Sequence, residues 1–439
     1  IVHYAFEDCT GFTGNLVIPS SVTEIGIDAF ESCSGFTGTL TLSEGLLKIE
    51  ECAFENCSGF TGNLVIPDSV TLIDEEAFRM PDLGPWGFTG GTLTLGSGLT
   101  KIKDSCFKKS KGFIGNLDIP AGVTHIEDEA FEEATGFTSL TLREGLDRIG
   151  QEAFEDCNFT GSLVLPDSLT TIDQHAFLRC DQFTGDLTIP NNVTKIEDEA
   201  FKDCTGFNGT LTIGSGLIDV EDYIFKDCTG FTGVTILSGA TTIGYGMFWN
   251  CSALTSVTIP EGVTSIGQFA FRNCDELTSI TLPDSLTSLG SNAFYSCSAL
   301  TSVTLPDSLT SIGSQAFLNC SSLTSVTIGD SVTSIGDGAF QDCSALTSIT
   351  LPSSLTEIGN HSFNDSGLTS ITIPANVHTI WHYTFQDCTA LDTVNCLATS
   401  APQLGVDAFD NISATEIHVP SGATGYGTTY GGLTVEYDL

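Results

Sequence analysis

Leu300–Ser322 reads LTSVTLPDSLTSIGSQAFLNCSS, and the stretch that follows it, Leu323–Ala345, reads LTSVTIGDSVTSIGDGAFQDCSA. The phenylalanine of the Ala-Phe signature can be followed through 18 copies: Phe6, Phe30, Phe54, Phe78, Phe107, Phe131, Phe154, Phe177, Phe201, Phe225, Phe248, Phe271, Phe294, Phe317, Phe340, Phe363, Phe385 and Phe409. Successive positions differ mostly by 24 up to Phe225 and mostly by 23 after it. A period this short and regular predicts a solenoid, in which each coil packs only on its neighbours.

One repeat can be translated into one coil. Val257 and Ile259 alternate with a polar residue, which predicts a strand with one buried face. Pro260 has no N–H to donate and ends the strand. Ile266 returns a second apolar group to the interior, and the segment around Phe271 is expected to form a short helical turn. Each coil therefore supplies one buried aromatic ring, and Phe271, Phe294 and Phe317 are predicted to be structural.

The predicted fold is a leucine-rich, mainly β solenoid with a parallel strand ladder and short helical turns, built from about 18 coils with a repeat period of 23–24. Residues 1–409 are expected to form one curved or twisted rod, whose period is 24 to about residue 230 and 23 after it, and residues 410–439 are expected to form a cap. The first half uses GFTGNLVIP, as at Gly11–Pro19, where the second half uses ALTSVTIP, as at Ala253–Pro260. This switch predicts a change of curvature near residues 231–254.

Acidic residues dominate the charge. The chain has 55 Asp and Glu against 14 Lys and Arg, a formal net charge of −41. Such a field repels phosphate backbones and anionic lipid surfaces, so nucleic acid is not an expected partner. Only Arg272 among the basic residues lies beyond Lys226.

Two further features concern the chain as a whole. No apolar stretch approaches the length of about 18 residues that indicates a membrane-spanning helix, so no membrane insertion is expected. The chain opens inside a repeat, and we interpret it as a mature or trimmed fragment.

Acidic clusters before three of the repeat phenylalanines allow two interpretations. They read IDEEAF at Ile73–Phe78 and IEDEAF at both Ile126–Phe131 and Ile196–Phe201. The clusters lack the Asp-x-Asp-x-Asp-Gly pattern of a calcium loop. A solvated acidic ridge is the preferred interpretation, and calcium binding is the alternative; no metal site or cofactor is predicted.

Thirteen of the 16 cysteines lie three positions after a repeat phenylalanine. Cys274, Cys297 and Cys320 are examples, and the shared register predicts a ladder of small buried groups. Because parallel side chains make the torsion of a disulfide difficult, free thiols are favoured over disulfides. The chain has no C-x-x-C pair, so a metal role is not expected. Cys52 and Cys106 lie off the ladder.

The clearest departure from the repeat follows Phe78. RMPDLGPWGFTGGTL at Arg79–Leu93 replaces the usual ENCSGFTGNL, and the next repeat phenylalanine is delayed to Phe107. The insertion carries Met80 and Trp86, and a basic cluster follows it: Lys101, Lys103, Lys108, Lys109 and Lys111. An aromatic residue beside basic residues is a candidate site for an acidic or glycan ligand. The alternative is a tolerated loop whose lysines relieve acidic repulsion.

A second departure is NVHTIWHYTF at Asn376–Phe385. His378 and His382 lie in it, and His361 is expected one coil away from His382. Three histidines could form a metal site, but surface histidines near the cap are the preferred interpretation.

The most regular candidate surface is made by the strands of the second half. They would present rows of hydroxyl groups: Thr255, Ser256, Thr258, Thr278, Ser279, Thr281, Thr301, Ser302 and Thr304. Repeated weak contacts can sum through multivalency. This surface therefore suits a polymer, a glycan or an extended protein partner.

The recurring LTSVTIPDSVTSIGxxAFxxC resembles the BspA-like class of leucine-rich repeats, found in bacterial and protist surface proteins, from about Ile1 to Phe409. ATEIHVPSGATGYGTTYGGLTVEYDL, at Ala414–Leu439, is similar to the closing segment of these proteins. The resemblance implies a leucine-rich-repeat solenoid and adhesion, and it carries no catalytic residues.

The expected function is a non-enzymatic cell-surface or secreted module that binds a host or microbial surface protein or glycan. The alternative is a spacer that projects another domain. The expected location is extracellular or cell-surface, with any signal or anchor outside this sequence.

Overall fold

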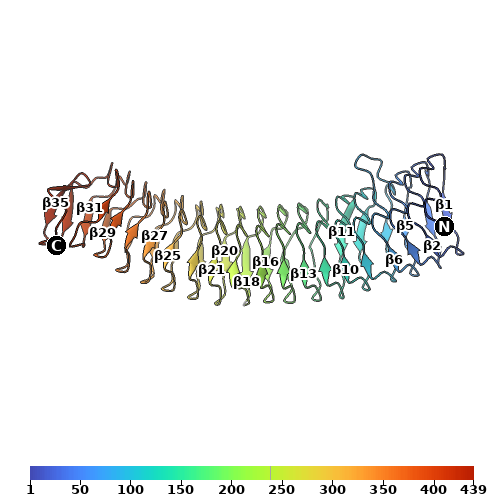
Figure 1. Ribbon diagram of the computed structural model, residues 1–439, viewed down its shortest axis with the longest axis horizontal. Helices are drawn as coiled ribbons and strands as arrows, with labels where there is room; N and C mark the ends of the chain where they lie inside the picture. Colours follow the sequence, from blue (N-terminus) through green and yellow to red (C-terminus); the bar gives the residue numbers. More distant parts are fainter. Residues whose placement is uncertain (238) are drawn as a thin grey trace. The chain divides into compact units, whose positions relative to one another are not determined.

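In the computed structural model, which describes residues 1–237 and 239–439, the chain divides into two compact units, Ile1–Cys228 and Thr229–Leu439. Each unit is a stack of coils that carry two series of short parallel strands (Figure 1). The chain forms a parallel β-solenoid of about 17 turns. The prediction of about 18 coils counted phenylalanines, and 18 such markers enclose 17 complete turns.

In the first unit, the strands of the first series each follow the Ala-Phe segment of the preceding coil. The series consists of β1 (Leu16–Ile18), β3 (Leu40–Leu42), β5 (Leu64–Val65), β7 (Leu93–Thr94), β9 (Gly115–Asp118), β11 (Phe137–Thr141), β14 (Leu187–Ile189) and β16 (Thr210–Ile213). The second series precedes the Ala-Phe segment of the same coil. It consists of β2 (Glu24–Ile25), β4 (Lys48–Ile49), β6 (Leu72–Ile73), β8 (Lys101–Ile102), β10 (His125–Ile126), β12 (Arg148–Ile149), β13 (Thr171–Ile172), β15 (Lys195–Ile196) and β17 (Asp219–Val220).

The second unit repeats this arrangement. Its first series is β18 (Gly233–Ile236), β20 (Ser256–Thr258), β22 (Ser279–Thr281), β24 (Ser302–Thr304), β26 (Ser325–Thr327), β29 (Ser370–Ile373), β31 (Thr393–Cys396), β33 (Glu416–Val419) and β35 (Leu433–Tyr437). Its second series is β19 (Thr242–Ile243), β21 (Ser265–Ile266), β23 (Ser288–Leu289), β25 (Ser311–Ile312), β27 (Ser334–Ile335), β28 (Glu357–Ile358), β30 (Thr379–Ile380) and β32 (Gln403–Leu404).

Strand pairing follows the sequence repeat. In β20 and β22, Ser256 pairs with Ser279 and Val257 with Ile280, which are equivalent positions of successive repeats. The same repeat position therefore recurs at the same place in successive coils. This register makes each repeat position a ladder of equivalent residues along the unit.

The segment around each repeat phenylalanine is not helical, so the prediction of short helical turns is wrong. We call this segment, residues 268–273 and its equivalents, the Ala-Phe turn. The N–H groups of Ala270 and Arg272 donate to carbonyl oxygens of Gly267 and Phe269, at 3.4 and 3.0 Å. The N–H of Phe271, between them, donates to the carbonyl oxygen of Ala293 in the next coil at 2.8 Å. Every second N–H group therefore donates to a carbonyl oxygen of the next coil, whereas the N–H groups of a helix donate to carbonyl oxygens of the same helix.

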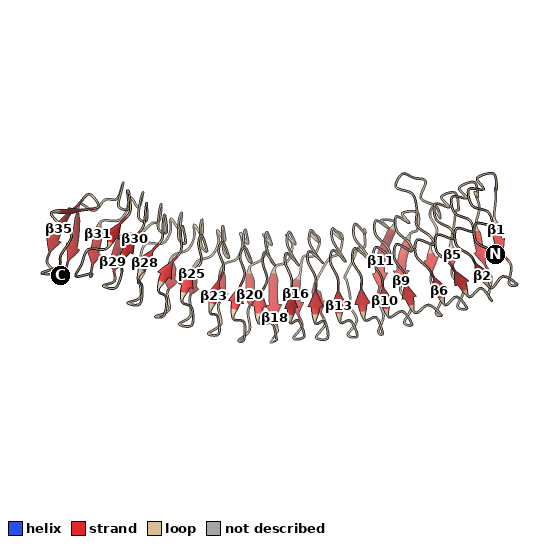
Figure 2. Ribbon diagram, viewed as in Figure 1, coloured by secondary structure: helices blue, strands red, loops and turns tan. Residues whose placement is uncertain are grey.

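Left-handed backbone explains how this pattern is made. Phe269 and Asn273 have φ of 61° and 58°, and the equivalent two positions have positive φ in nearly every coil. A left-handed residue at every fourth position interrupts any right-handed helix. Figure 2 shows strands and loops, and no helix, in the part of the chain that the structure describes.

The repeat phenylalanines form an inner column in each unit. Successive rings from Phe6 to Phe225 and from Phe248 to Phe409 have centroids 5.1–5.7 Å apart and interplanar angles of 0–19°. Phe271, Phe294 and Phe317 are fully buried, which agrees with the structural role expected for them.

The first unit carries a second aromatic column beside the first. Phe36, Phe60 and Phe88 stack in sequence, and Phe88 meets Phe78 of the inner column edge-on at 65°. From Leu254 to Leu391 this position is leucine, as at the buried Leu277. The exchange of phenylalanine for leucine between the halves is therefore an exchange of core residues.

The C-terminal segment pairs with the last coil. β34 (Thr429–Tyr430) lies antiparallel to β35, and β35 pairs parallel with β33. The Tyr426 hydroxyl donates to the Ala398 carbonyl oxygen at 2.7 Å, and the Tyr430 hydroxyl to that of Pro402 at 2.9 Å.

Two expectations about the whole chain stay predictions. One is the continuity of the solenoid over residues 1–409. The other is the change of curvature near residues 231–254, a range that includes residue 238, which lies outside the described residues.

Candidate binding surfaces

The predicted hydroxyl rows contain two kinds of side chain. Thr255, Thr278 and Thr301 each donate their hydroxyl to a backbone carbonyl of the preceding coil, at 2.8, 3.4 and 3.1 Å. Each bond spans 23 residues and connects equivalent repeat positions. These three threonines therefore hold neighbouring coils together.

The remaining six residues form an exposed surface, which we call the hydroxyl face: Ser256, Thr258, Ser279, Thr281, Ser302 and Thr304. The Cα atoms of the three serines lie in register across β20, β22 and β24, and Thr258 pairs with Thr281. Within the described residues, none of their hydroxyls forms a hydrogen bond with another group of the chain. All six are therefore free to exchange water for a ligand.

Two residues of the insertion after Phe78 were predicted to bind a ligand, and only one of them, Trp86, is exposed. Met80 is 1% exposed, so its side chain belongs to the core, and this corrects its assignment to a ligand-binding surface. Its Sδ lies 3.1 Å from the position that a Cβ on Gly87 would take. Trp86 is 38% exposed, and Lys111 Nζ lies 5.5 Å from its ring centroid.

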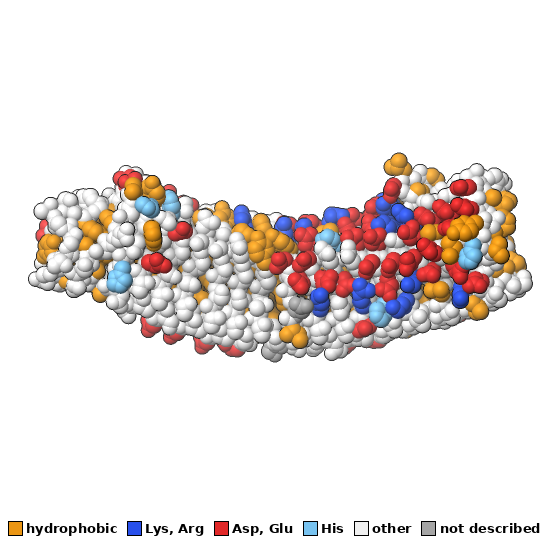
Figure 3. Space-filling model, in the orientation of Figure 1, with side chains coloured by type: hydrophobic (Ala, Val, Ile, Leu, Met, Phe, Trp, Pro, Cys, Tyr) orange, Lys and Arg blue, Asp and Glu red, His pale blue; other side chains and the backbone are white. Residues whose placement is uncertain are grey.

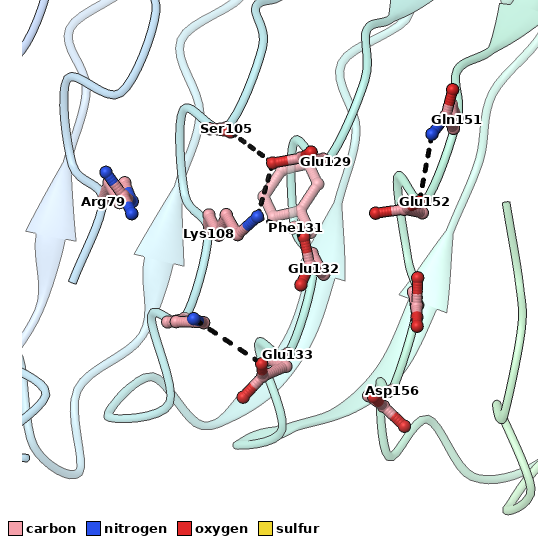
Figure 4. Close-up of polar contacts among 12 residues, drawn as sticks. Arg79, Ser105, Lys108, Glu129, Phe131, Glu132, Glu133, Gln151, Glu152 and Asp156 are labelled. Atoms are coloured by element: carbon pink, nitrogen blue, oxygen red, sulfur yellow. Dashed lines mark hydrogen bonds and ion pairs between the residues drawn. The ribbon is translucent and has the colours of Figure 1, made fainter. Parts of the chain in front are cut away.

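The lysines near the insertion are paired with carboxylates. Lys108 contacts both Glu129 and Glu132 of the next coil, and Ser105 also donates to Glu129 (Figure 4). Burial opposes the charge of Lys108, but the hydrogen bonds to these two glutamates raise its pKa above the usual value.

The neighbouring lysines follow the same rule. Their carboxylate partners are Glu127 for Lys101 at 2.8 Å, Glu75 for Lys103 at 3.8 Å, Asp82 for Lys109, and Glu133 for Lys111 at 2.5 Å. These contacts favour the interpretation in which the lysines relieve acidic repulsion.

Three groups contain side chains whose ligand atoms could meet at a metal ion. They are Cys52, Glu55 and Glu76; Glu152, Glu155 and His175; and Glu129, Glu132 and Glu152, each with atoms within 4.8 Å of one another. Every group already holds a cation of the chain: Arg79 at the first, Arg179 at the second and Lys108 at the third. A positive neighbour competes with a metal ion for the same oxygens.

The acidic clusters are likewise paired in part. Glu127 accepts from Lys101 and from Arg148, both at 2.8 Å. Glu199 pairs with Lys202 at 2.8 Å. Acidic and basic side chains consequently lie side by side on this face of the first unit (Figure 3).

The predicted histidine group is divided between other contacts. The His361 ring stacks on Tyr383 with centroids 4.8 Å apart. His382 Nδ1 accepts from the backbone N–H of Val406 at 2.8 Å, and His378 is exposed. The three histidines are not among the metal-type groups found in the described residues.

All 16 cysteines are free thiols, as the register predicts. Cys274, Cys297 and Cys320 are fully buried, and each donates its thiol to the carbonyl oxygen of the repeat phenylalanine one coil earlier, at 3.1–3.3 Å. Burial raises the pKa of these thiols. Cys106 is also buried, whereas Cys52 is half-buried.

Sequence reasoning missed an aromatic group on the Ala-Phe turns of the second unit. Trp249, Arg272 and Tyr295 occupy the same position, directly after the repeat phenylalanine, in three successive coils. The Arg272 guanidinium lies 4.9 Å from the Trp249 ring centroid and 4.5 Å from that of Tyr295. Aligning this one position across the repeats would have found the group.

The repeat itself identifies the relatives of the chain. A family model described as "BspA type Leucine rich repeat region (6 copies)" matches residues 1–97, 87–208, 181–298, 208–324 and 310–429. No curated protein matches the chain.

No helix capable of crossing a membrane occurs in residues 1–237 and 239–439.

A solved structure gives the same fold. A leucine-rich repeat protein from Bacteroides ovatus is 23% identical, with a TM-score of 0.56, over 78% of this chain and 88% of that chain. A leucine-rich repeat protein from T. pallidum is 30% identical over 36% and 75%, with a TM-score of 0.34. A leucine-rich cell surface protein from Faecalibacterium prausnitzii is 23% identical over 75% and 82%, with a TM-score of 0.33.

Proposed function

Because this chain belongs to the BspA-type leucine-rich repeat family, we propose that it is a non-enzymatic binding module whose hydroxyl face engages an extended or repetitive partner. The module acts at the cell surface or in secreted form, and its partner is a surface protein or glycan of a host or another microbe. The family is a repeat scaffold, and such scaffolds host functions on surfaces built from their coils.

The observation that supports the proposal is that the hydroxyl groups of each coil make different contacts. In three successive coils, the threonine before the strand is bonded to the backbone, as Thr301 is to the Thr278 carbonyl oxygen at 3.1 Å. The serine and threonine within the strand are exposed and unbonded in the described part of the chain, as Ser302 and Thr304 are. Structural need therefore accounts for the first hydroxyl and leaves the other two for a ligand.

The repetition supplies the affinity that a single coil lacks. Equivalent hydroxyls in neighbouring parallel strands are about 4.7–4.9 Å apart. One hydrogen bond contributes a net of about 0.5–1.5 kcal/mol. Several coils that bind one continuous partner sum these contributions without a second loss of association entropy.

A pull-down with matched variants tests the proposal. The full chain is immobilised and offered matrix proteins, a glycan array and whole microbial cells. The test variant changes Ser279 and Ser302 to Ala and Thr281 and Thr304 to Val. The control variant changes Ser288 and Ser311 to Ala, because these exposed serines lie on β23 and β25 of the same coils.

We expect a bound partner whose affinity falls at least about tenfold for the test variant and little for the control. If no member of the panel binds the unchanged chain more strongly than it binds a control chain with shuffled surface residues, the result would support the spacer function instead. Equal losses for the two variants would remove the hydroxyl face from the binding site.

A further inference from the structure

Arg272 is set apart from the other basic residues by its lack of an acidic partner. Thirteen of the 14 Lys and Arg side chains lie within 4.0 Å of a carboxylate oxygen: Lys48, Arg79, Lys101, Lys103, Lys108, Lys109, Lys111, Arg143, Arg148, Arg179, Lys195, Lys202 and Lys226. In the described part of the chain Arg272 has no such contact, although acidic residues outnumber basic ones 55 to 14. Asp275 and Glu276 follow it in the same coil, and neither pairs with it.

The guanidinium is held by aromatic rings instead. Its Cζ lies 4.9 Å from the Trp249 centroid, 5.3 Å from that of Phe269 and 4.5 Å from that of Tyr295. Tyr245 meets Phe269 edge-on, with centroids 5.3 Å apart. We call these five residues the Arg272 site.

The repeat register builds this arrangement. Trp249, Arg272 and Tyr295 occupy one ladder position, so the guanidinium sits between a ring from the coil before and a ring from the coil after. Backbone hydrogen bonds from Phe248 to Ala270 at 2.9 Å and from Phe271 to Ala293 at 2.8 Å fix the register. The site is therefore preorganised on rigid turns rather than on a free loop.

Within the described residues, none of the side-chain N–H groups of Arg272 donates a hydrogen bond. Nε is buried and has no hydrogen-bond partner. The two terminal nitrogens also form no hydrogen bond within the described residues, and they are not among the buried unpaired atoms, so they reach solvent. A guanidinium presents its N–H groups in a plane and binds a carboxylate through two parallel hydrogen bonds. Three aromatic rings lie within 5.3 Å of its Cζ, and the two terminal nitrogens stay available for such a pair of bonds.

The composition of the site points to a protein partner. Trp, Tyr and Arg are the residues most enriched at the energetic centres of protein interfaces. All five side chains are half-buried, so each can lose further area to a partner. A polyanionic polysaccharide would bring many negative charges to a chain of net charge −41. A single carboxylate set among uncharged side chains avoids that repulsion, since surface charges are screened beyond about 8–10 Å.

We propose that the Arg272 site binds an Asp or Glu carboxylate of a partner protein, with apolar atoms beside that carboxylate packed on Trp249, Phe269 and Tyr295. The proposal rests on the proposed binding function but concerns a different surface, the Ala-Phe turns. It therefore adds a specific anchor to the weak and repetitive contacts of the hydroxyl face.

Selection from displayed random linear peptides against the immobilised full chain tests the proposal. We expect enriched peptides to carry Asp or Glu next to an aromatic or aliphatic residue. A synthetic copy of one such peptide should bind the Arg272→Gln variant more than about tenfold more weakly than the unchanged chain. Arg272→Lys should recover only part of the loss, because lysine lacks the planar pair of donors.

A change in the peptide keeps the test independent of folding. Replacing the peptide's acidic residue by its amide should cause a similar loss with the unchanged chain, and no further loss with Arg272→Gln. Trp381→Ala, at an aromatic side chain 39% exposed elsewhere in the second unit, is the matched control and should bind normally.

Three results would overturn the proposal: enriched peptides without acidic residues, equal binding by Arg272→Gln, or no enrichment at all. Arg272-dependent binding of oligogalacturonate in place of peptides would overturn the assignment to a protein. The hydroxyl-face variant should bind the peptide normally, so failure of the hydroxyl face and failure of this site are separate observations.

Discussion

Replacing Phe317 by alanine would remove a ring that is fully buried and stacked on both sides. Its centroid lies 5.4 Å from those of Phe294 and Phe340, at 6° and 2°. Burial of a phenyl side chain contributes about 1.5–3 kcal/mol, and each stacked pair about 0.5–1.5 kcal/mol more. We therefore expect Phe317→Ala to lower the free energy of unfolding by about 3–5 kcal/mol, the range for buried Phe→Ala substitutions.

The damage should be local, because coils couple only to their nearest neighbours. Hydrogen exchange read by mass spectrometry would detect it. We expect amides in the coils of Phe294, Phe317 and Phe340 to lose protection, and amides in the coil of Phe385 to keep it. Uniform loss of protection through the second unit would refute nearest-neighbour stacking.

Phe12→Ala is the matched control on stability. Phe12 is 41% exposed, so its replacement should cost about 1–2 kcal/mol. Denaturant unfolding compares the two variants. Equal costs for Phe12 and Phe317 would show that burial of the ring does not set the cost of removing it.

The remaining predictions concern glycines, carboxylates and thiols. Gly112→Ala should destabilise strongly in thermal unfolding, because its Cβ would lie 1.7 Å from the Gly87 carbonyl oxygen, whereas Gly11→Ala meets nothing within 4 Å; similar melting temperatures would contradict the close approach. Burial and the nearby Glu55, Asp28, Glu7 and Asp8 raise the pKa of Glu31 above its usual value, so its charge costs stability at pH 7 and not below the unfolded pKa. Glu31→Gln should therefore stabilise at pH 7 by an amount that disappears on acidification, and a destabilised variant at pH 7 would reverse the sign. Burial raises the pKa of Cys343 to about 12. Alkylation at pH 8 followed by peptide mapping should therefore label the half-buried Cys9 and leave Cys343 unlabelled until the chain unfolds. Rapid labelling of Cys343 in the folded chain would contradict its burial.

The repeat made most of the fold predictable. Val257 and Ile259 alternate with Thr258, and this alternation correctly placed β20 with one buried face. The Ala-Phe turn was predicted wrongly because its decisive contacts are not local. Phe269 has left-handed backbone although its side chain does not favour it, and the N–H of Phe271 bonds to Ala293 of the next coil.

The candidate sites were predicted less well, because they depend on neighbours across coils. Met80 looked exposed in a long insertion, but its side chain fills space beside Gly87. Lys108 looked available until the register placed Glu129 and Glu132 next to it. Arg272 was noted as an isolated cation, yet only the ladder position shared with Trp249 and Tyr295 showed what surrounds it.

Dipolar electron paramagnetic resonance would measure the stacking of coils directly. Spin labels are placed in pairs at Ser256, Ser279, Ser302 and Ser325, which occupy one register position of β20, β22, β24 and β26. Cys9 and Cys52, the half-buried thiols, are first replaced. We predict that the distance grows by about 4.7–4.9 Å for each added coil. Distances that fail to grow in equal steps would contradict the claim that one repeat makes one coil stacked in register.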